Sequence, residues 1–200
     1  MLLSIKILLF FIAGLLLGVF GKFDPLPFES NLTKYALYLL MFLVGVSIGA
    51  DSKALQLIRQ QGIRLLLIPL ATILGTFVGV VLMMVFLDSI TVREGLAVGA
   101  GFGYYSLSSI ILSEIHSDAL GVVALLANVI RELITLLLAP LMVVIFGKLG
   151  PVAAAGATSM DTSLPIITTA SGKDFAVIAL VHGIILTILV PMLVTFIMWV

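Results

Sequence analysis

Apolar residues along this chain fall into long runs that are separated by short polar stretches. Two of the runs, residues 65–87 and 175–200, are uncharged and reach the roughly 18–20 residues that a helix needs to cross a bilayer. The pattern therefore predicts an all-α polytopic membrane protein. Its seven apolar segments are expected at about 2–20, 35–50, 65–87, 94–112, 119–146, 152–170 and 174–199.

The connections between these segments are short, which predicts a single integral membrane domain over residues 1–200. Only residues 21–34 and 51–64 resemble aqueous loops. The first apolar run is one of many, so it is interpreted as a retained span and not as a cleaved signal. The chain is therefore expected to pass the membrane several times.

Composition supports the membrane interpretation. Hydrophobic residues make up 62% of the 200 residues and charged residues 10%, against about 45–50% and about 25% in soluble proteins. The absence of cysteine excludes disulfides, thiolate metal sites and cysteine nucleophiles. The formal net charge is zero and no basic block occurs, so no nucleic-acid partner is expected. The lipid bilayer is the partner that composition implies.

Two segments, 94–112 and 152–170, differ from lipid-facing helices because small, hydroxyl-bearing and proline residues interrupt them. Lipid cannot satisfy the backbone groups that an interruption frees, so such backbone must be buried in protein or line a watery cavity. Interrupted helices build many transporter binding sites, which favours a transporter domain. The interrupting residues are Gly99, Gly101, Gly103, Ser106, Ser108 and Ser109 in the first segment, and Gly156, Thr158, Ser159, Asp161, Thr162, Ser163 and Pro165 in the second.

Four polar residues gather on one face of the helix expected at 119–146. They are Asn128, Arg131, Glu132 and Thr135, spaced as i, i+3, i+4 and i+7. An ionisable group near the bilayer centre costs at least about 2.5–3.5 kcal/mol, so this face should turn toward the bundle interior and mark a substrate or proton pathway. The alternative is a structural pair in which Arg131 and Glu132 neutralise each other.

Asp161 lies within the interruption at 156–165, where hydroxyl groups surround it. A carboxylate at this place can pair with a substrate ammonium group or exchange a proton, and half-helix ends add dipoles and unpaired backbone groups. Ser159 and Thr162 would complete the polar cavity. The alternative for Asp161 is a capping role next to Pro165.

Three further side chains are weaker candidates for binding substrate or protons. Tyr105 and Ser106 fall in the hydroxyl-rich run 101–109, which ordinary helix packing explains equally well. His182 stands alone in an apolar segment, where a hydrogen-bonded packing histidine is as reasonable as a proton relay. The acidic and histidine residues of 114–118 resemble a solvated connection. No full metal-ligand set and no cofactor motif is visible, so neither is expected.

Four blocks of sequence carry a further signal. They are residues 99–108 (GAGFGYYSLS), 128–134 (NVIRELI), 156–161 (GATSMD) and 181–183 (VHG). In this order and spacing they resemble the LysO lysine-exporter family, and the likeness covers most of the chain. The resemblance implies export of L-lysine across the cytoplasmic (inner) membrane as lysine/proton antiport. By motif position, Glu132 and Asp161 correspond to the two intramembrane acids of that family.

The resemblance also implies a fold and a mode of assembly. The family is distantly similar to sodium/proton antiporters and bile-acid-type transporters, which are built from inverted repeats with two crossing interrupted helices. Full-length members resemble this chain plus about three preceding spans. We therefore expect a short form whose missing spans come from a second copy, in a homo-oligomer, or from a small membrane partner.

Alternative functions remain open on the sequence alone. Acids beside an interrupted helix also suit a sodium/proton antiporter, and the short length suits a non-transporting subunit of a split carrier. An intramembrane hydrolase using Ser106 and His182 is the weakest alternative, because nothing in the sequence brings the two side chains together. The chain is not expected to be an enzyme.

Overall fold

The computed structural model describes residues 63–87 and 89–200, together with Tyr35, Leu39, Phe42 and Val46. Contacts divide the chain into two units, Met1–Tyr38 and Leu39–Val200, and the helices bounded below all belong to the second. The segment expected at 2–20, most of that at 35–50 and most of the loop expected at 51–64 lie outside the described residues. A single domain over residues 1–200 stays a prediction.

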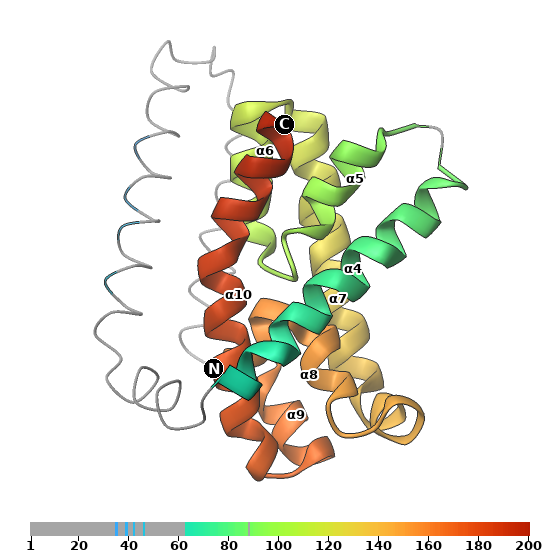
Figure 1. Cartoon of the computed structure of the whole chain (residues 1–200), viewed down its shortest axis with the longest axis vertical. Helices are drawn as coiled ribbons and strands as arrows, with labels where there is room; N and C mark the ends of the chain where they lie inside the picture. The colour runs from blue at the N-terminus through green and yellow to red at the C-terminus, as the bar shows by residue number, and fades with distance from the viewer. Residues whose placement is uncertain (1–34, 36–38, 40–41, 43–45, 47–62, 88) are drawn as a thin grey trace, which may run out of the picture. The chain divides into compact units, whose positions relative to one another are not determined.

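Within the described residues all regular secondary structure is helical, with seven α-helices, two short 3-10 helices and no strand. Three α-helices, α4, α7 and α10, are long and apolar enough to cross a membrane, which confirms the spans predicted at 65–87, 119–146 and 174–199. In chain order the elements are η1 (Ile63–Leu66), α4 (Leu67–Met84), α5 (Val92–Gly99), α6 (Tyr105–Ile115), α7 (Asp118–Phe146), α8 (Gly150–Ala155), η2 (Gly156–Met160), α9 (Leu164–Ser171) and α10 (Asp174–Trp199) (Figure 1).

The longest helix, α7, begins and ends at residues that favour helix termini. The hydroxyl of Ser117 accepts a hydrogen bond from the backbone N–H of Leu120 (3.3 Å), and Asp118 adds a negative charge at the positive end of the helix. The helix ends at Gly147, whose φ of +77° suits a residue without a Cβ. Its 29 residues extend about 43 Å, longer than the roughly 30 Å of a hydrocarbon core.

The outer faces of the long helices are apolar. Leu137, Val144 and Phe146 of α7 and Phe196 and Trp199 of α10 are all exposed. In water such a surface would favour aggregation, whereas in a bilayer these side chains contact lipid chains. The distribution of exposed side chains therefore fits a multi-pass membrane protein.

The segment predicted at 94–112 is interrupted as expected. Helix α5 ends at Gly99 and α6 begins at Tyr105, and the turns between them carry two positive φ angles. Gly103 has φ +90° and Phe102 has φ +43°. A positive φ is uncommon for a residue with a side chain, so the surroundings of Phe102 must hold it in place.

The segment predicted at 152–170 is interrupted more extensively. After α8 the backbone reverses at Gly156, with φ +65°, and continues as the short 3-10 helix η2. A turn over residues 161–163 follows, and α9 starts at Leu164. Pro165 lies in the first turn of α9, where its missing N–H leaves no hydrogen bond unmade.

The two interruptions touch each other through their backbones. The N–H of Ala157 donates a hydrogen bond to the carbonyl oxygen of Phe102 (2.8 Å). A Cβ on Gly156 would lie 2.1 Å from that same oxygen, and a Cβ on Gly103 would lie 2.8 Å from the carbonyl oxygen of Ala155. Because both approaches are too close for any side chain, glycine is required on each side of the contact. We name this backbone contact between the two interruptions the crossing.

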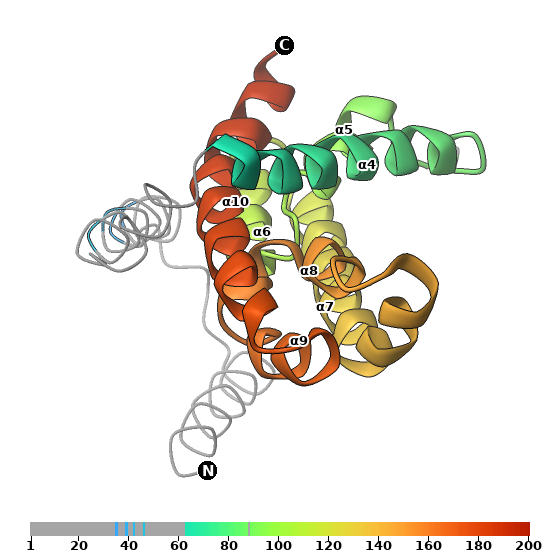
Figure 2. The ribbon, with the colours of Figure 1, turned by 60° about the horizontal axis from the view of Figure 1, so that its bottom comes forward.

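The crossing is packed between α7 and α10. Helices α5 and α6 lie toward the C-terminal end of α10 and α8 and α9 toward its start (Figure 1), and all four contact both long helices. Figure 2 shows α8 and α9 between α7 and α10, with α4 running across α10 and α5. Gly183 lets α10 approach η2, because a Cβ there would lie 2.7 Å from the carbonyl oxygen of Ala157.

We expect Gly156→Ala to destabilise the protein by more than about 2 kcal/mol, because the new Cβ would collide with the carbonyl of Phe102 in a backbone conformation that alanine disfavours. Thermal unfolding of the purified protein in detergent measures the effect. Gly79→Ala is the matched control, since a Cβ there meets no described atom within 4 Å. Equal melting temperatures for the two variants would contradict the crossing.

Candidate functional site

The two acids singled out from the sequence meet at one hydroxyl group. Glu132 is buried on α7, and the hydroxyl of Thr162 donates a hydrogen bond to its Oε1. The same hydroxyl lies 3.3 Å from Oδ1 of Asp161, which also accepts the backbone N–H of Thr162 at 2.6 Å. A hydroxyl carries a single hydrogen, so Thr162 can donate to only one carboxylate at a time. The structure thus places one shared donor between two carboxylates.

The turn that carries Asp161 is held by hydrogen bonds around it. The N–H of Asp161 donates to the carbonyl of Thr158 (3.2 Å), and the hydroxyls of Thr158 and Ser163 lie 3.0 Å apart. Thr158 also donates to the carbonyl of Ala155, at the end of α8 (3.0 Å). Asp161 is exposed while Glu132 is buried, so the two acids differ in their access to water.

A small cavity of about 60 Å³ opens beside Asp161 where both interruptions meet α10. Its lining residues are Tyr104, Ala157, Thr158, Met160, Asp161 and Thr187. Tyr104 and Thr187 were not selected from the sequence as site residues. Tyr104 stands in the run 101–109, but only the backbone at the interruption decides which of two adjacent tyrosines faces the cavity. Thr187 lies in an apolar run and carries no sequence signal.

Asn128 holds the first interruption in place. Its Oδ1 accepts the N–H of Gly103 (2.7 Å), and its Nδ2 donates to the carbonyls of Val98 (3.1 Å) and Ala124 (2.9 Å). Val98 lies near the end of α5, where carbonyl groups lose their intrahelical partners. Asn128 therefore positions backbone, and both of its amide hydrogens are used in doing so.

Arg131, one helical turn further on, binds the second interrupted segment. Its Nε and Nη2 donate to the carbonyls of Ala154 (2.8 Å) and Ala153 (3.0 Å), in the last turn of α8. Its Nη1 donates to the hydroxyl of Thr76 on α4 (3.3 Å), and the guanidinium lies 5.9 Å from the ring centroid of Phe102. A cation stabilises the C-terminal carbonyls of a helix. Arg131 thus contacts α8 and α4, whereas Glu132 contacts Thr162.

His182 and Ser159 form a separate cluster. The Nε2 of His182 lies 2.9 Å from the hydroxyl of Thr72 on α4, and its Nδ1 lies 3.1 Å from the hydroxyl of Ser159. The Ser159 hydroxyl also lies within hydrogen-bond distance of the carbonyls of Gly156 and Ala179. The cluster joins α4, η2 and α10. Both ring nitrogens of His182 are engaged away from Ser106, so the hydrolase pairing considered above does not form.

Tyr105 and Ser106 begin α6 and are half-buried. Neither lines the cavity beside Asp161. The structure therefore gathers Glu132, Asp161 and Thr162, and places these two residues elsewhere.

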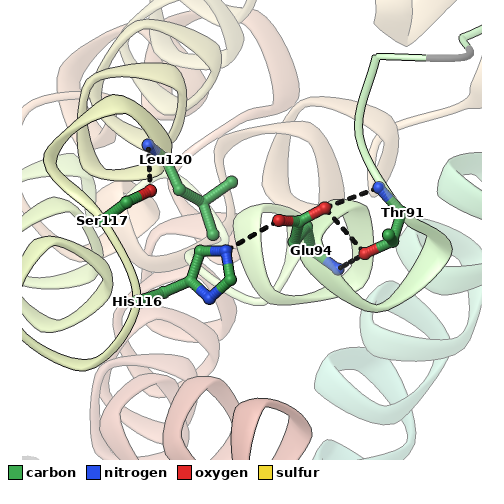
Figure 3. A network of polar contacts seen from close by, with 5 residues as sticks. All are labelled: Thr91, Glu94, His116, Ser117 and Leu120. Atoms are coloured by element: carbon green, nitrogen blue, oxygen red, sulfur yellow. Dashed lines mark hydrogen bonds and ion pairs between the residues drawn. The ribbon is translucent and has the colours of Figure 1, made fainter.

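At the N-terminal end of α5, a second polar network centres on Glu94 and includes His116. Glu94 and Thr91 cap the helix reciprocally, with Glu94 Oε2 accepting the Thr91 N–H at 2.6 Å. The other carboxylate oxygen of Glu94 lies 2.7 Å from Nε2 of His116, so the carboxylate sits between the two residues (Figure 3). In the part of the chain that the structure describes, no three acidic, histidine or cysteine side chains form a group that could hold a metal ion.

A larger groove of about 620 Å³ lies between α4 and α7. Asn128, Arg131 and Thr135 contribute to its wall, but no carboxylate does. A cation therefore finds an opposite charge in the small cavity beside Asp161 and not in this groove.

Interrupted helices that cross between apolar spans, with carboxylates beside the crossing, are the architecture of a membrane transporter. The chain matches the model of the family described as "Lysine exporter LysO" over residues 8–198, and it therefore belongs to this family. This is a family of membrane transporters and not of enzymes.

Two relatives give the extent of the likeness. A protein of Escherichia coli (strain K12) named "Lysine exporter LysO" is 32% identical over 196 residues, which cover 96% of this chain and 63% of that protein. A protein of Haemophilus influenzae named "Putative lysine exporter" is 33% identical over 187 residues, which cover 92% of this chain and 93% of that protein. The chain thus spans less than two thirds of the first relative. No solved structure matches it.

We expect Asn128→Leu to lower the stability by about 1–3 kcal/mol, because it leaves the buried N–H of Gly103 without its partner and removes one of the hydrogen bonds to the carbonyl of Val98. Thermal unfolding in detergent measures the loss. Thr135→Val is the control, because Thr135 is buried on the same face. Among the described residues its hydroxyl bonds only the carbonyl of Arg131 in its own helix. If both variants unfold at the same temperature, Asn128 does not hold the interruption.

Proposed function

We propose that this protein exports L-lysine across the cytoplasmic membrane in exchange for protons. The observation that supports this most directly is the placement of Glu132 and Asp161 around the single hydroxyl of Thr162. Membership of a lysine-exporter family supports the choice of substrate. The name of the Escherichia coli relative, of which the chain covers 63%, points to the same amino acid.

A buried carboxylate offers a physical basis for the exchange. An ionised acid at membrane depth is costly unless a cation or a proton neutralises it. The side-chain ammonium of lysine and a proton are alternative neutralising groups for Glu132 and Asp161. If each occupies the acids in turn, outward movement of lysine is coupled to inward movement of protons. Asn128, Arg131, Ser159 and His182 then hold the helices around the acids.

The crossing supports a carrier mechanism in which the interrupted segments form the substrate site. In sodium/proton antiporter and bile-acid-transporter folds, crossed interrupted helices hold the ligand near the bilayer midplane while surrounding helices move. We propose that this chain shares that distant kinship. Helices α7 and α10, which contact all four half-helices, would then define the two walls of the site.

Assembly is part of the same proposal. The likeness covers 63% of the Escherichia coli relative, and we propose that this chain works together with a second copy of itself or with a small membrane partner. Cross-linking in native membranes, compared with the chain purified alone, tests this assembly. A chain that transports as a stable monomer would contradict it.

Loss of either acid should strongly reduce export. We expect Asp161→Asn and Glu132→Gln each to reduce efflux of labelled lysine by about tenfold or more, because a charge-assisted contact of about 1.5–3 kcal/mol is lost. Efflux is measured from loaded vesicles under an imposed pH gradient, acidic on the receiving side. Asp174→Asn is the matched control, since Asp174 is an exposed acid in the first turn of α10.

Other outcomes of this experiment would point to a different function or to different residues. Sodium-driven proton movement without lysine movement would favour a sodium/proton antiporter and overturn the substrate. Efflux that needs a co-expressed small membrane partner would identify the chain as one subunit of a split carrier. Undiminished efflux in both acid variants would contradict the role of the acids.

Thr162 provides a finer test of the coupling. We expect Thr162→Val to weaken coupling between lysine and proton movement, because it removes the hydroxyl that lies between the two carboxylates. Thr162→Ser keeps that hydroxyl and should retain most of the coupling. The measurement is the ratio of protons entering to lysine leaving. A valine variant with the unaltered ratio would show that the shared hydroxyl is dispensable.

A further inference from the structure

The cavity beside Asp161 combines a negative charge with groups suited to a small organic cation. Its volume of about 60 Å³ is far below the roughly 300–1,000 Å³ of pockets that enclose a whole small molecule. It can therefore accept one end of a substrate, not the entire molecule. Its wall has a carboxylate from Asp161, an aromatic ring from Tyr104, a hydroxyl from Thr187 and apolar atoms from Met160 and Ala157.

Two of the polar groups are available to a ligand. The hydroxyl of Thr187 has one contact among the described residues, a weak one to the sulfur of Met160 at 3.9 Å. The phenol of Tyr104 has no hydrogen bond to any residue that the structure describes. By contrast, the hydroxyl of Thr158 already bonds Ala155 and Ser163. Residues with oxygen-bearing side chains from three different segments thus line one small space.

We infer that this cavity binds a primary ammonium group, the side-chain end of the exported amino acid, and that Tyr104 and Thr187 determine specificity for it. The inference rests on the proposed function. An ammonium group is compact and donates three hydrogen bonds, which Asp161, Thr187 and Tyr104 can accept. The face of the Tyr104 ring adds attraction for a cation, and Met160 and Ala157 suit the adjoining methylene groups.

A guanidinium group suits the cavity less well. It is planar, donates five hydrogen bonds in a fixed fork and pairs best with a carboxylate that offers both oxygens. One oxygen of Asp161 already accepts the N–H of Thr162 at 2.6 Å. The arrangement therefore selects lysine and its shorter ammonium homologues over arginine.

The location of the cavity links binding to the crossing. Tyr104 belongs to the first interruption, Met160 and Asp161 to the second, and Thr187 to α10. A bound ammonium group would contact all three elements at once. Binding at this place thus acts on the same backbone contact that joins the two interrupted segments.

The test compares two pairs of isosteric variants. Thr187→Val and Tyr104→Phe each remove one hydroxyl from the cavity, while Thr169→Val and Tyr105→Phe remove hydroxyls from side chains that do not line it. We expect the first pair to lower the apparent affinity for lysine in vesicle efflux by about tenfold, the effect of one hydrogen bond to a charged group. Inhibition of lysine efflux by arginine should be weak in the unsubstituted protein and in every variant. A lysine-to-arginine preference that no cavity variant changes would overturn the inference.

A binding measurement separates this inference from the proposed export. The purified protein is heated with n-butylammonium or with n-butylguanidinium, two probes that differ in the cationic end. We expect n-butylammonium to raise the melting temperature of the unsubstituted protein and of Tyr105→Phe. The same concentration should raise that of Thr187→Val clearly less and should not raise that of Asp161→Asn. Equal stabilisation by both probes, or by neither, would overturn the cavity assignment. Selective binding of n-butylammonium without lysine efflux would overturn the export proposal alone.

Discussion

The backbone contact between the two interrupted segments is the constraint on which the rest of the structure depends. The hydrogen bond from the N–H of Ala157 to the carbonyl of Phe102 satisfies two backbone groups at the interruptions, which lipid could not satisfy. The contact is close enough that Gly103 and Gly156 leave no room for a side chain. Because the two segments meet here, the turn with Asp161 and the turn with Tyr104 come to border one cavity.

Helix α7 supports this crossing through side chains on adjacent turns. Asn128 binds the first interruption, Arg131 binds the last carbonyls of α8, and Glu132 reaches Thr162 in the second interruption. Arg131 therefore has a structural role, because the partial negative charge of the helix carbonyls balances its positive charge. The acid accepts its hydrogen bond from the hydroxyl of Thr162 and not from the neighbouring arginine. Although Arg131 and Glu132 are adjacent in the sequence and opposite in charge, their side chains thus contact different parts of the structure.

Much of the fold and part of the site could be predicted from the sequence. Apolar runs predicted α4, α7 and α10, because a helix that crosses a bilayer must match its thickness. Clusters of glycine, serine and proline predicted both interruptions. The spacing of Asn128, Glu132 and Thr135 placed them on one buried face. Family blocks pointed to Glu132 and Asp161, and the structure joins these two through Thr162.

Tertiary structure alone decided the rest. The sequence placed Ser159 and Thr162 in one polar cavity and left His182 open between packing and proton relay. In the structure Ser159 lies within hydrogen-bond distance of His182, whereas Thr162 lies in the following turn and contacts the acids. The sequence also favoured Tyr105 over Tyr104, and it contained no signal for Thr187. Local periodicity determines which residues share a helix face. Which faces meet across an irregular turn depends on long-range packing, here on how closely two glycine-containing backbones approach.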